Sequence, residues 1–223
     1  MEKDSAGRIS TRALMLPRLY AILDAEVLVC QKMEIGLAAK QLRDAGVTLV
    51  QYRDKTGTPE QVLRNAKIIG DVFSGVDGML VLNDDPALAV LSGWNAVHVG
   101  QGDAAVDEAR KILLPGGLVG SSTHNDQQVA VADATGADYV AIGPVFATGT
   151  KADADPVVGL EGVRRARALT SRPLVAIGGI TLANASSVIA AGADSVAVIS
   201  ALFTGPGTVG DVVCGFRRIL GDR

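Results

Sequence analysis

A regular alternation of short apolar runs with longer helix-like segments most constrains what this chain can fold into. The runs are continuously apolar rather than alternating with polar residues, which is expected when helices cover both faces of a parallel sheet. Eight such runs can be counted, and each is followed by a segment with helical character. The expected strands are 18–23, 47–52, 79–82, 96–99, 118–120, 140–142, 174–177 and 196–199.

The segments between these runs carry helix signals. Val62, Ala66 and Ile69 share one helical face, and Asp85-Pro86 has the N-cap and first-position residues of a helix start. The expected helices are 33–44, 59–73, one that opens at 85–86, 104–113, 125–134, 160–169, 182–191 and 209–220. A weak repeat supports this count, because a glycine precedes each even-numbered strand: Gly46, Gly93, Gly136 and Gly192.

Eight strand–helix units predict a single-domain α/β protein with the (β/α)₈ TIM-barrel fold, near the short end of the usual size. We expect the barrel to occupy residues 17–223 and residues 1–16 to be a flexible leader. An open doubly wound sheet is the alternative fold. It is less favoured because no Gly-x-Gly-x-x-Gly follows the first strand.

Composition excludes several classes of protein. The 223 residues are 48% hydrophobic with a net charge of −3, so neither a basic nucleic-acid surface nor a transmembrane run of 18 apolar residues is present. The first residues lack the apolar segment of a secretory signal, so we expect a cytoplasmic protein. The oligomeric state stays open, a homo-oligomer included.

Polar or glycine-rich residues follow seven of the eight expected strands. Active sites of such barrels form on the loops after the strands, so these residues should gather at one mouth. The segments that leave strands two to eight are 51–55, 83–84, 100–103, 121–124, 148–151, 178–181 and Ser200.

Three of these segments predict a phosphate pocket. Thr148-Gly149-Thr150-Lys151 combines hydroxyls, a glycine and an ammonium group directly after a buried strand. The Gly178-Gly179 pair lets the backbone approach a ligand and precedes an expected helix start, which favours an anion. Ser200 can add a hydroxyl. The alternatives are an ordinary polar loop at Thr148 and a tight turn at Gly178.

The other side of the mouth predicts a diphosphate site with a metal. Arg53, Lys55 and Lys151 supply three positive charges, and Asp84 and Asp103 supply two carboxylates. Mg²⁺ is typically held by one or two carboxylates together with substrate phosphates and water. The alternatives are that Asp103 caps the helix expected at 104–113 and that the three cations are solvated surface charges.

The two histidines are expected to be structural. His98 lies between valines on a strand, and His124 sits where a helix starts, so hydrogen-bonded core or rim positions are favoured. With no nucleophile triad or metal-type histidine spacing, hydrolase and zinc chemistry are disfavoured.

Taken in order, these motifs resemble the thiamine-phosphate synthase family over about residues 18–203. The resemblance is carried by Gln51-Tyr52-Arg53-Asp54-Lys55, Asn83-Asp84-Asp85, His98-Val99-Gly100-Gln101-Gly102-Asp103, Gly120-Ser121-Ser122-Thr123-His124, Gly143-Pro144-Val145-Phe146, Thr148-Gly149-Thr150-Lys151 and Ala176-Ile177-Gly178-Gly179-Ile180. It implies a transferase that joins 4-amino-2-methyl-5-(diphosphooxymethyl)pyrimidine to 4-methylthiazole ethyl phosphate, giving thiamine monophosphate and diphosphate, with one Mg²⁺ per site.

The resemblance also implies roles for individual residues. The pyrimidine diphosphate would be bound by Gln51, Tyr52, Arg53, Asp54, Lys55, Asn83, Ser122 and Lys151, with Arg53, Lys55 and Lys151 catalytic. The thiazole phosphate would be bound by Thr148, Gly149, Thr150, Gly179, Ile199 and Ser200, and Mg²⁺ by Asp84 and Asp103. Ser121 and Ala147 depart from the family pattern, where an apolar residue and proline are frequent.

The implied mechanism needs no enzyme nucleophile: the pyrimidine loses diphosphate, and the thiazole nitrogen captures the resulting carbocation. Two alternatives remain, a thiazole tautomerase of the same superfamily and a non-catalytic phosphate-binding barrel. Neither requires the cations and carboxylates together. A sugar-phosphate epimerase is disfavoured because its metal site would need more histidines.

Overall fold

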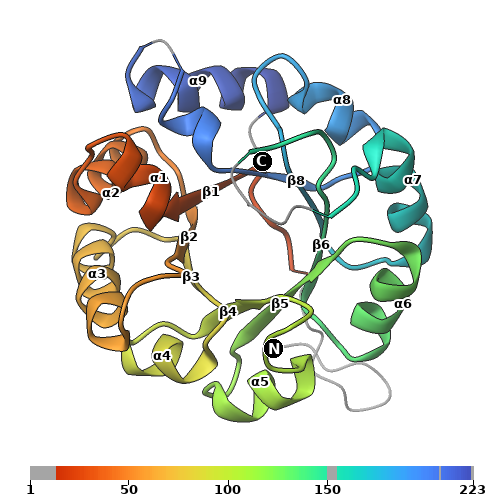
Figure 1. The fold of residues 1–223 in the computed structure, drawn as a ribbon, viewed down its shortest axis with the longest axis horizontal. Helices are drawn as coiled ribbons and strands as arrows, with labels where there is room; N and C mark the ends of the chain where they lie inside the picture. Colours follow the sequence, from red (N-terminus) through yellow and green to blue (C-terminus); the bar gives the residue numbers. More distant parts are fainter. Residues whose placement is uncertain (1–13, 150–154, 206, 222–223) are drawn as a thin grey trace, which may run out of the picture.

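Eight parallel strands close into a barrel inside a ring of helices (Figure 1). This computed structural model describes residues 14–149, 155–205 and 207–221. The strands are β1 (Leu19–Asp24), β2 (Leu49–Arg53), β3 (Met79–Asn83), β4 (Ala96–Val99), β5 (Leu118–Thr123), β6 (Tyr139–Ile142), β7 (Leu174–Ile177) and β8 (Ser195–Val198). Each strand pairs with its neighbours in sequence, and β8 pairs with β1. The predicted TIM barrel is confirmed, and the doubly wound sheet is excluded.

Helices cover the outside of the barrel and bring the chain back to the start of the next strand. They are α1 (Ala25–Cys30), α2 (Ile35–Asp44), α3 (Pro59–Val72), α4 (Pro86–Leu91), α5 (Val106–Ile112), α6 (Asp126–Ala134), α7 (Gly159–Leu169), α8 (Ala185–Ala190), the 3₁₀ helix η1 (Ser200–Leu202) and α9 (Val209–Leu220). As predicted, Asp85 caps α4 through its side chain. No described helix is both long and apolar enough to span a membrane.

The structure corrects the prediction at several elements. The helices α1 and η1 were not expected, because each is too short to show helical periodicity. Strand β5 runs on to Thr123, so Ser121 and Ser122 lie within a strand and not in a loop. Helix α8 begins at Ala185, later than the residue 182 we expected, so the Gly178-Gly179 pair does not lead directly into a helix.

Each strand alternates its side chains between two apolar layers. Leu19, Ala21 and Leu23 face the large layer between strands and helices, whereas Tyr20 and Ile22 face the smaller interior of the barrel. On β2 this alternation places the even-numbered residues outside and the odd-numbered ones inside. Gln51 and Arg53 therefore point into the barrel, where their side chains can reach its mouth.

The N-terminal boundary also differs from the prediction. Residues 1–13 of the expected leader lie outside the described residues. Leu16, which the leader was expected to include, is buried against the interior cluster of the barrel, and Leu14 packs against the same cluster. The barrel therefore begins before residue 17.

Candidate functional site

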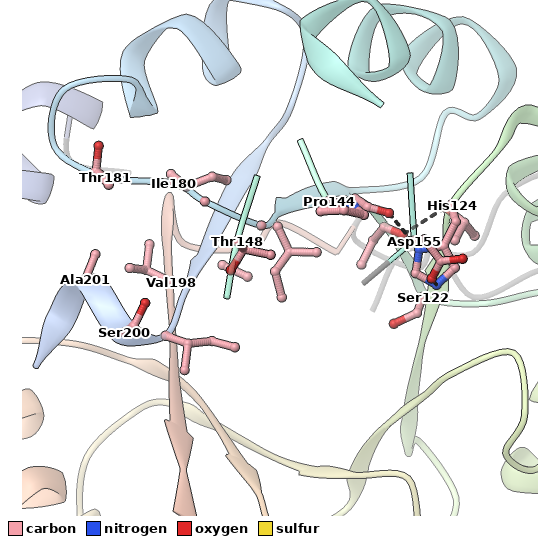
Figure 2. A pocket seen from close by; sticks show the side chains of 18 of the residues that line it. Ser122, His124, Pro144, Thr148, Asp155, Ile180, Thr181, Val198, Ser200 and Ala201 are labelled. Atoms are coloured by element: carbon pink, nitrogen blue, oxygen red, sulfur yellow. Dashed lines mark hydrogen bonds and ion pairs between the residues drawn. The ribbon is translucent and has the colours of Figure 1, made fainter. Parts of the chain in front are cut away.

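Two adjoining cavities lie at the carboxyl ends of the strands. The larger has a volume of about 180 Å³ and lies between the loops that follow β5 to β8 (Figure 2). The smaller lies within the barrel and is lined by residues from all eight strands. The two cavities share five lining residues: Ser122, Ala141, Ile177, Ala197 and Ile199. Ligands in the two cavities would therefore lie next to each other.

The larger cavity combines an apolar floor with a polar rim. Its floor includes Ile177, Ala197 and Ile199, whereas hydroxyl groups enter from Thr148 and Ser200. Thr148, from the β6–α7 loop, and Ser200, the first residue of η1, both line this cavity (Figure 2). A small aromatic ring with a phosphate group matches this division. Four of the residues predicted to bind the thiazole phosphate line the cavity: Thr148, Gly179, Ile199 and Ser200.

Gly178 and Gly179 close one wall of this cavity because only glycine fits there. Both have positive φ angles, 102° and 62°. A Cβ atom on Gly179 would lie 2.6 Å from the Ala147 carbonyl oxygen and 2.8 Å from the Phe146 Cβ. The main-chain N–H of Phe146 donates to the Gly178 carbonyl at 3.0 Å. The β7–α8 loop is thus packed directly against the loop that carries Thr148.

His124 lies at the edge of the larger cavity and ties two loops together. Its Nδ1 lies 2.6 Å from the Gly143 carbonyl oxygen, and its Nε2 lies 3.3 Å from a carboxylate oxygen of Asp155 (Figure 2). The prediction of a hydrogen-bonded rim histidine is confirmed. Thr150 and Lys151, which lie between Gly143 and Asp155 in sequence, are outside the described residues, and Gly149 is exposed.

Asp84 occupies a strained backbone position at the end of β3. Its φ angle is 69°, in the left-handed region that non-glycine residues rarely adopt, and such strain is often found at functional sites. Its main-chain N–H donates to the His98 carbonyl at 2.7 Å, and Lys55 forms an ion pair with its carboxylate. The predicted cation and carboxylate are therefore in contact.

Asp103 lies beside Asp84, and the two carboxyl groups share a hydrogen bond. Burial raises the pKa of Asp84 and the neighbouring Asp103 raises it further, whereas Lys55 opposes the rise. Burial also disfavours the charged form of Asp103. Even so, hydrogen bonds from Asp84 and from the Gly100 N–H hold the pKa of Asp103 below its ordinary value. The two carboxyl groups at the mouth thus lie close enough to perturb each other's pKa.

This pair suits a divalent cation, since its positive charge would offset the repulsion between two neighbouring carboxylates. Asp103 does not cap α5, which begins at Val106 after the N-cap residue Ala105; its carboxylate accepts from the Gly100 N–H at 2.8 Å. The helix-cap alternative for Asp103 is therefore wrong. In the described parts of the chain, no group of three or more His, Cys, Asp or Glu residues could hold a metal. Two carboxylates and phosphate oxygens are the usual magnesium ligands.

Arg53 is held by a residue that the sequence analysis missed. Asp24 and Arg53 are paired in the β1–β2 register, and they form a buried ion pair. The second carboxylate oxygen of Asp24 accepts from the Val27 N–H at 3.0 Å and so caps α1. Strand one was the only strand whose exit we did not consider. An acid directly after its apolar run was the available signal.

The smaller cavity contains four predicted ligands of the pyrimidine substrate. They are Gln51, Arg53, Asn83 and Ser122, and His98 lies among them. The prediction that His98 is a buried, hydrogen-bonded histidine is confirmed, because its ring contacts Tyr139 and Ser122.

Tyr52 and Asp54 do not share this position. The Tyr52 side chain lies in the outer layer, where its hydroxyl bonds to Asp54 and to Asn65 of α3. Asp54 accepts from the Thr56 and Gly57 N–H groups. We had expected both residues to bind substrate. Their side chains instead shape the loop that carries Lys55.

Comparisons with known proteins agree with this arrangement. The family model for thiamine monophosphate synthase matches residues 19–202. The thiamine-phosphate synthase of Koribacter versatilis is 50% identical over 198 residues, covering 86% of this chain and 92% of the relative. That of Methanoculleus marisnigri is 46% identical over 174 residues, covering 78% and 81%. The solved thiamine phosphate pyrophosphorylase from Pyrococcus furiosus superposes with a TM-score of 0.80 at 28% identity, over 91% of this chain and 95% of that chain.

Proposed function

This chain belongs to the thiamine monophosphate synthase family, and from that membership we propose how its two cavities divide the work of a thiamine-phosphate synthase. The chain is a transferase that couples a pyrimidine diphosphate to a thiazole phosphate and releases diphosphate. One observation carries the assignment of the cavities: they share five lining residues, so two different ligands can meet there.

We place the pyrimidine diphosphate in the smaller cavity and across the acidic pair. Gln51, Asn83 and Ser122 would bind the heterocycle, and Lys55 would contact the diphosphate. Asp84 and Asp103 would hold Mg²⁺, which when bound supplies positive charge beside the departing diphosphate. Lys55 and Arg53 favour departure because their charges interact more strongly with the diphosphate as the C–O bond breaks. Lys151, which lies outside the described residues, keeps its predicted place in this group.

We place the thiazole phosphate in the larger cavity. The apolar floor at Ile177 and Ile199 would hold the ring, and Thr148, Ser200 and the backbone at Gly179 would hold the phosphate. The ring nitrogen would then face the carbon that loses diphosphate, because the cavities adjoin. Holding the two reactants in this way replaces an encounter in solution by reaction between neighbours.

The acidic pair discriminates between this function and the two alternatives. A tautomerase of the superfamily or a phosphate-binding barrel would use the larger cavity alone. Neither accounts for the strained Asp84 in contact with both Lys55 and Asp103. A cytoplasmic location and the absence of nucleic-acid and membrane partners stay predictions from the sequence.

The test is diphosphate release by the purified chain. We expect release only when both substrates and Mg²⁺ are present, with loss of turnover on chelation and recovery when Mg²⁺ is added back. Asp84→Asn removes one charge but suits the left-handed backbone, and it should lower kcat at least about a hundredfold. Asp85→Asn is the matched control, since Asp85 is the adjacent helix cap.

Two outcomes would count against this assignment. If the wild-type chain releases no diphosphate with both substrates and Mg²⁺ present, the coupling activity itself is wrong. If Asp84→Asn keeps turnover within threefold of the wild type, the metal assignment is wrong while the activity stands.

A further inference from the structure

A row of five polar side chains crosses the interior of the barrel. Gln51 Nε2 donates to the Tyr20 hydroxyl at 2.9 Å, which lies 3.0 Å from the Tyr139 hydroxyl. The Tyr139 hydroxyl lies 3.0 Å from His98 Nδ1, and His98 Nε2 lies 2.8 Å from Ser122 Oγ. We call this row the hydrogen-bond relay. Its two ends, Gln51 and Ser122, both line the smaller cavity.

The three middle residues of the relay are too buried for water to compete with their bonds. The exposed fractions are 1% for Tyr20, 0% for Tyr139 and 7% for His98. Burial raises the pKa of both tyrosines well above the ordinary value for the side chain, so both hydroxyls keep their protons at neutral pH. Each hydroxyl therefore has one proton to donate, and each can also accept.

The backbone makes room for the relay at Gly120. In the sheet register Gly120 lies between His98 and Tyr139, and a Cβ atom there would lie 2.0 Å from the Tyr139 ring. The missing side chain allows the Tyr139 ring to stack on His98 with centroids 5.5 Å apart. The tyrosine is thus fixed in position by the strand beside it.

The bond at Gln51 sets the direction in which protons are donated along the relay. Because the Gln51 amide group donates to Tyr20, the Tyr20 proton is available to Tyr139, and the Tyr139 proton to His98 Nδ1. His98 then carries its proton on Nε2 and donates it to Ser122 Oγ. The hydroxyl proton of Ser122 and the amide oxygen of Gln51 remain for a ligand.

We propose that Tyr20, Tyr139 and His98 are positioning residues that fix Gln51 as an acceptor and Ser122 as a donor toward the heterocycle. This inference rests on the proposed function, in which that heterocycle is an aminopyrimidine. Its exocyclic amine donates to the Gln51 oxygen, and a ring nitrogen accepts from Ser122. A 4-oxo pyrimidine reverses this pattern of donors and acceptors, so the relay selects against it.

The relay also strengthens the amine contact during the reaction. As diphosphate leaves, positive charge spreads from the pyrimidine methylene onto the exocyclic amine, whose N–H becomes a better donor. The Gln51 oxygen is the acceptor of that N–H, and donation by its own amide group to Tyr20 polarises it further. Gln51 thereby binds the transition state more tightly than the ground state.

The first experiment reads the protonation of His98 directly and needs no substrate. The chain contains only two histidines, so ¹⁵N NMR of the imidazole nitrogens, with a His124→Gln sample for assignment, isolates His98. We expect Nε2 protonated and Nδ1 unprotonated at neutral pH. A proton on Nδ1, or on both nitrogens, would overturn the direction of the relay. In Tyr139→Phe we expect a mixture of the two tautomers.

The second experiment measures the consequence for the substrate. Tyr139→Phe keeps the ring over Gly120 but cuts the relay, so the KM for the aminopyrimidine diphosphate should rise about five- to tenfold. The KM for the thiazole phosphate should not change, and the preference for the amino over the 4-oxo pyrimidine should fall at least about tenfold. Ser195→Ala is the control, since it removes a buried hydroxyl from a barrel strand outside the relay.

The two experiments separate the relay from the proposed function. The expected tautomer without any coupling activity would leave the relay standing and refute the proposed function. If the wild type is active but Tyr139→Phe keeps the wild-type preference for the amino pyrimidine, the relay is refuted and the proposed function stands. The melting temperature of Tyr139→Phe must show that the variant is folded.

Discussion

Asp24→Asn should destabilise the chain far more than so conservative a change suggests. Asp24 uses one oxygen to accept from the Val27 N–H and the other to pair with Arg53. Asparagine has a single oxygen, so it can satisfy only one of these donors, and its amide group faces the other. Because Asp24 is 1% exposed and the Arg53 side chain 11%, water replaces the lost acceptor only poorly.

The size of the destabilisation depends on which of the two donors, Val27 N–H or Arg53, loses its acceptor. Losing only the cap costs about 1 kcal/mol, whereas leaving the buried guanidinium without its carboxylate costs about 3–5 kcal/mol. Since asparagine restores no negative charge, we expect the free energy of unfolding to fall by about 3–5 kcal/mol. For a chain of this length that is a drop in melting temperature of about 6–20 °C.

The assay is urea unfolding compared with a matched variant. Asp85→Asn makes the same change at another helix cap, but there one oxygen accepts both from Ala87 and from Leu88. Asparagine can keep both of those bonds, so this control should lose only a few tenths of a kcal/mol. If Asp24→Asn unfolds within about 1 kcal/mol of Asp85→Asn, the buried pair does not hold Arg53 as we describe.

A ligand should partly rescue the same variant. Arg53 lines the smaller cavity, so an anion bound there takes the place of the missing carboxylate. Inorganic diphosphate with Mg²⁺ should therefore raise the melting temperature of Asp24→Asn more than that of the wild type. An equal rise in both would mean that the bound anion does not reach Arg53.

Two further changes test other parts of the mouth and of the barrel wall. Gly179→Ala places a Cβ 2.6 Å from the Ala147 carbonyl oxygen. In steady-state kinetics the KM for the thiazole phosphate should therefore rise at least about tenfold, while the KM for the pyrimidine diphosphate should not change. The control is Gly136→Ala, where φ is also positive (83°) but a Cβ atom meets nothing within 4 Å. Asp211 accepts from the main-chain N–H and hydroxyl of Thr208, which lowers its pKa from 3.8. Its contribution to stability is thus present above pH about 4 and is lost as the pH falls through the lowered pKa. In Asp211→Asn the free energy of unfolding should therefore depend less on pH in this acid range. An unchanged pH dependence in the variant would refute the assignment.

The strands could be predicted because each buried run in a parallel barrel is continuously apolar. The polar residues that follow the strands were also recognisable in the sequence. They predicted that Lys55, Asp84 and Asp103 gather at one mouth of the barrel, where Asp84 contacts both of the others. The prediction ended strand β5 at Gly120 because the two serines after it look like a loop. They continue the strand because a ring and hydrogen-bond partners from neighbouring strands fill the space around them.

The relay could not be predicted, because nothing local marks its members. Tyr20, Gln51, His98 and Tyr139 come from four different strands and have no spacing in common. Each one alone is an ordinary polar residue within an apolar run, and only the closure of the barrel brings them together. Asp24 does carry a local signal, as an acid directly after the first apolar run, but its partner Arg53 lies on the next strand.

The floor shared by the two cavities limits how this enzyme can change. Ala141 and Ala197 face both chambers, so a larger side chain at either position intrudes on two substrates together. Enlarging one cavity to admit a bulkier substrate likewise changes the shape of the other cavity. Variants that accept new thiazoles should therefore alter pyrimidine affinity as well, unless the change is made at the rim.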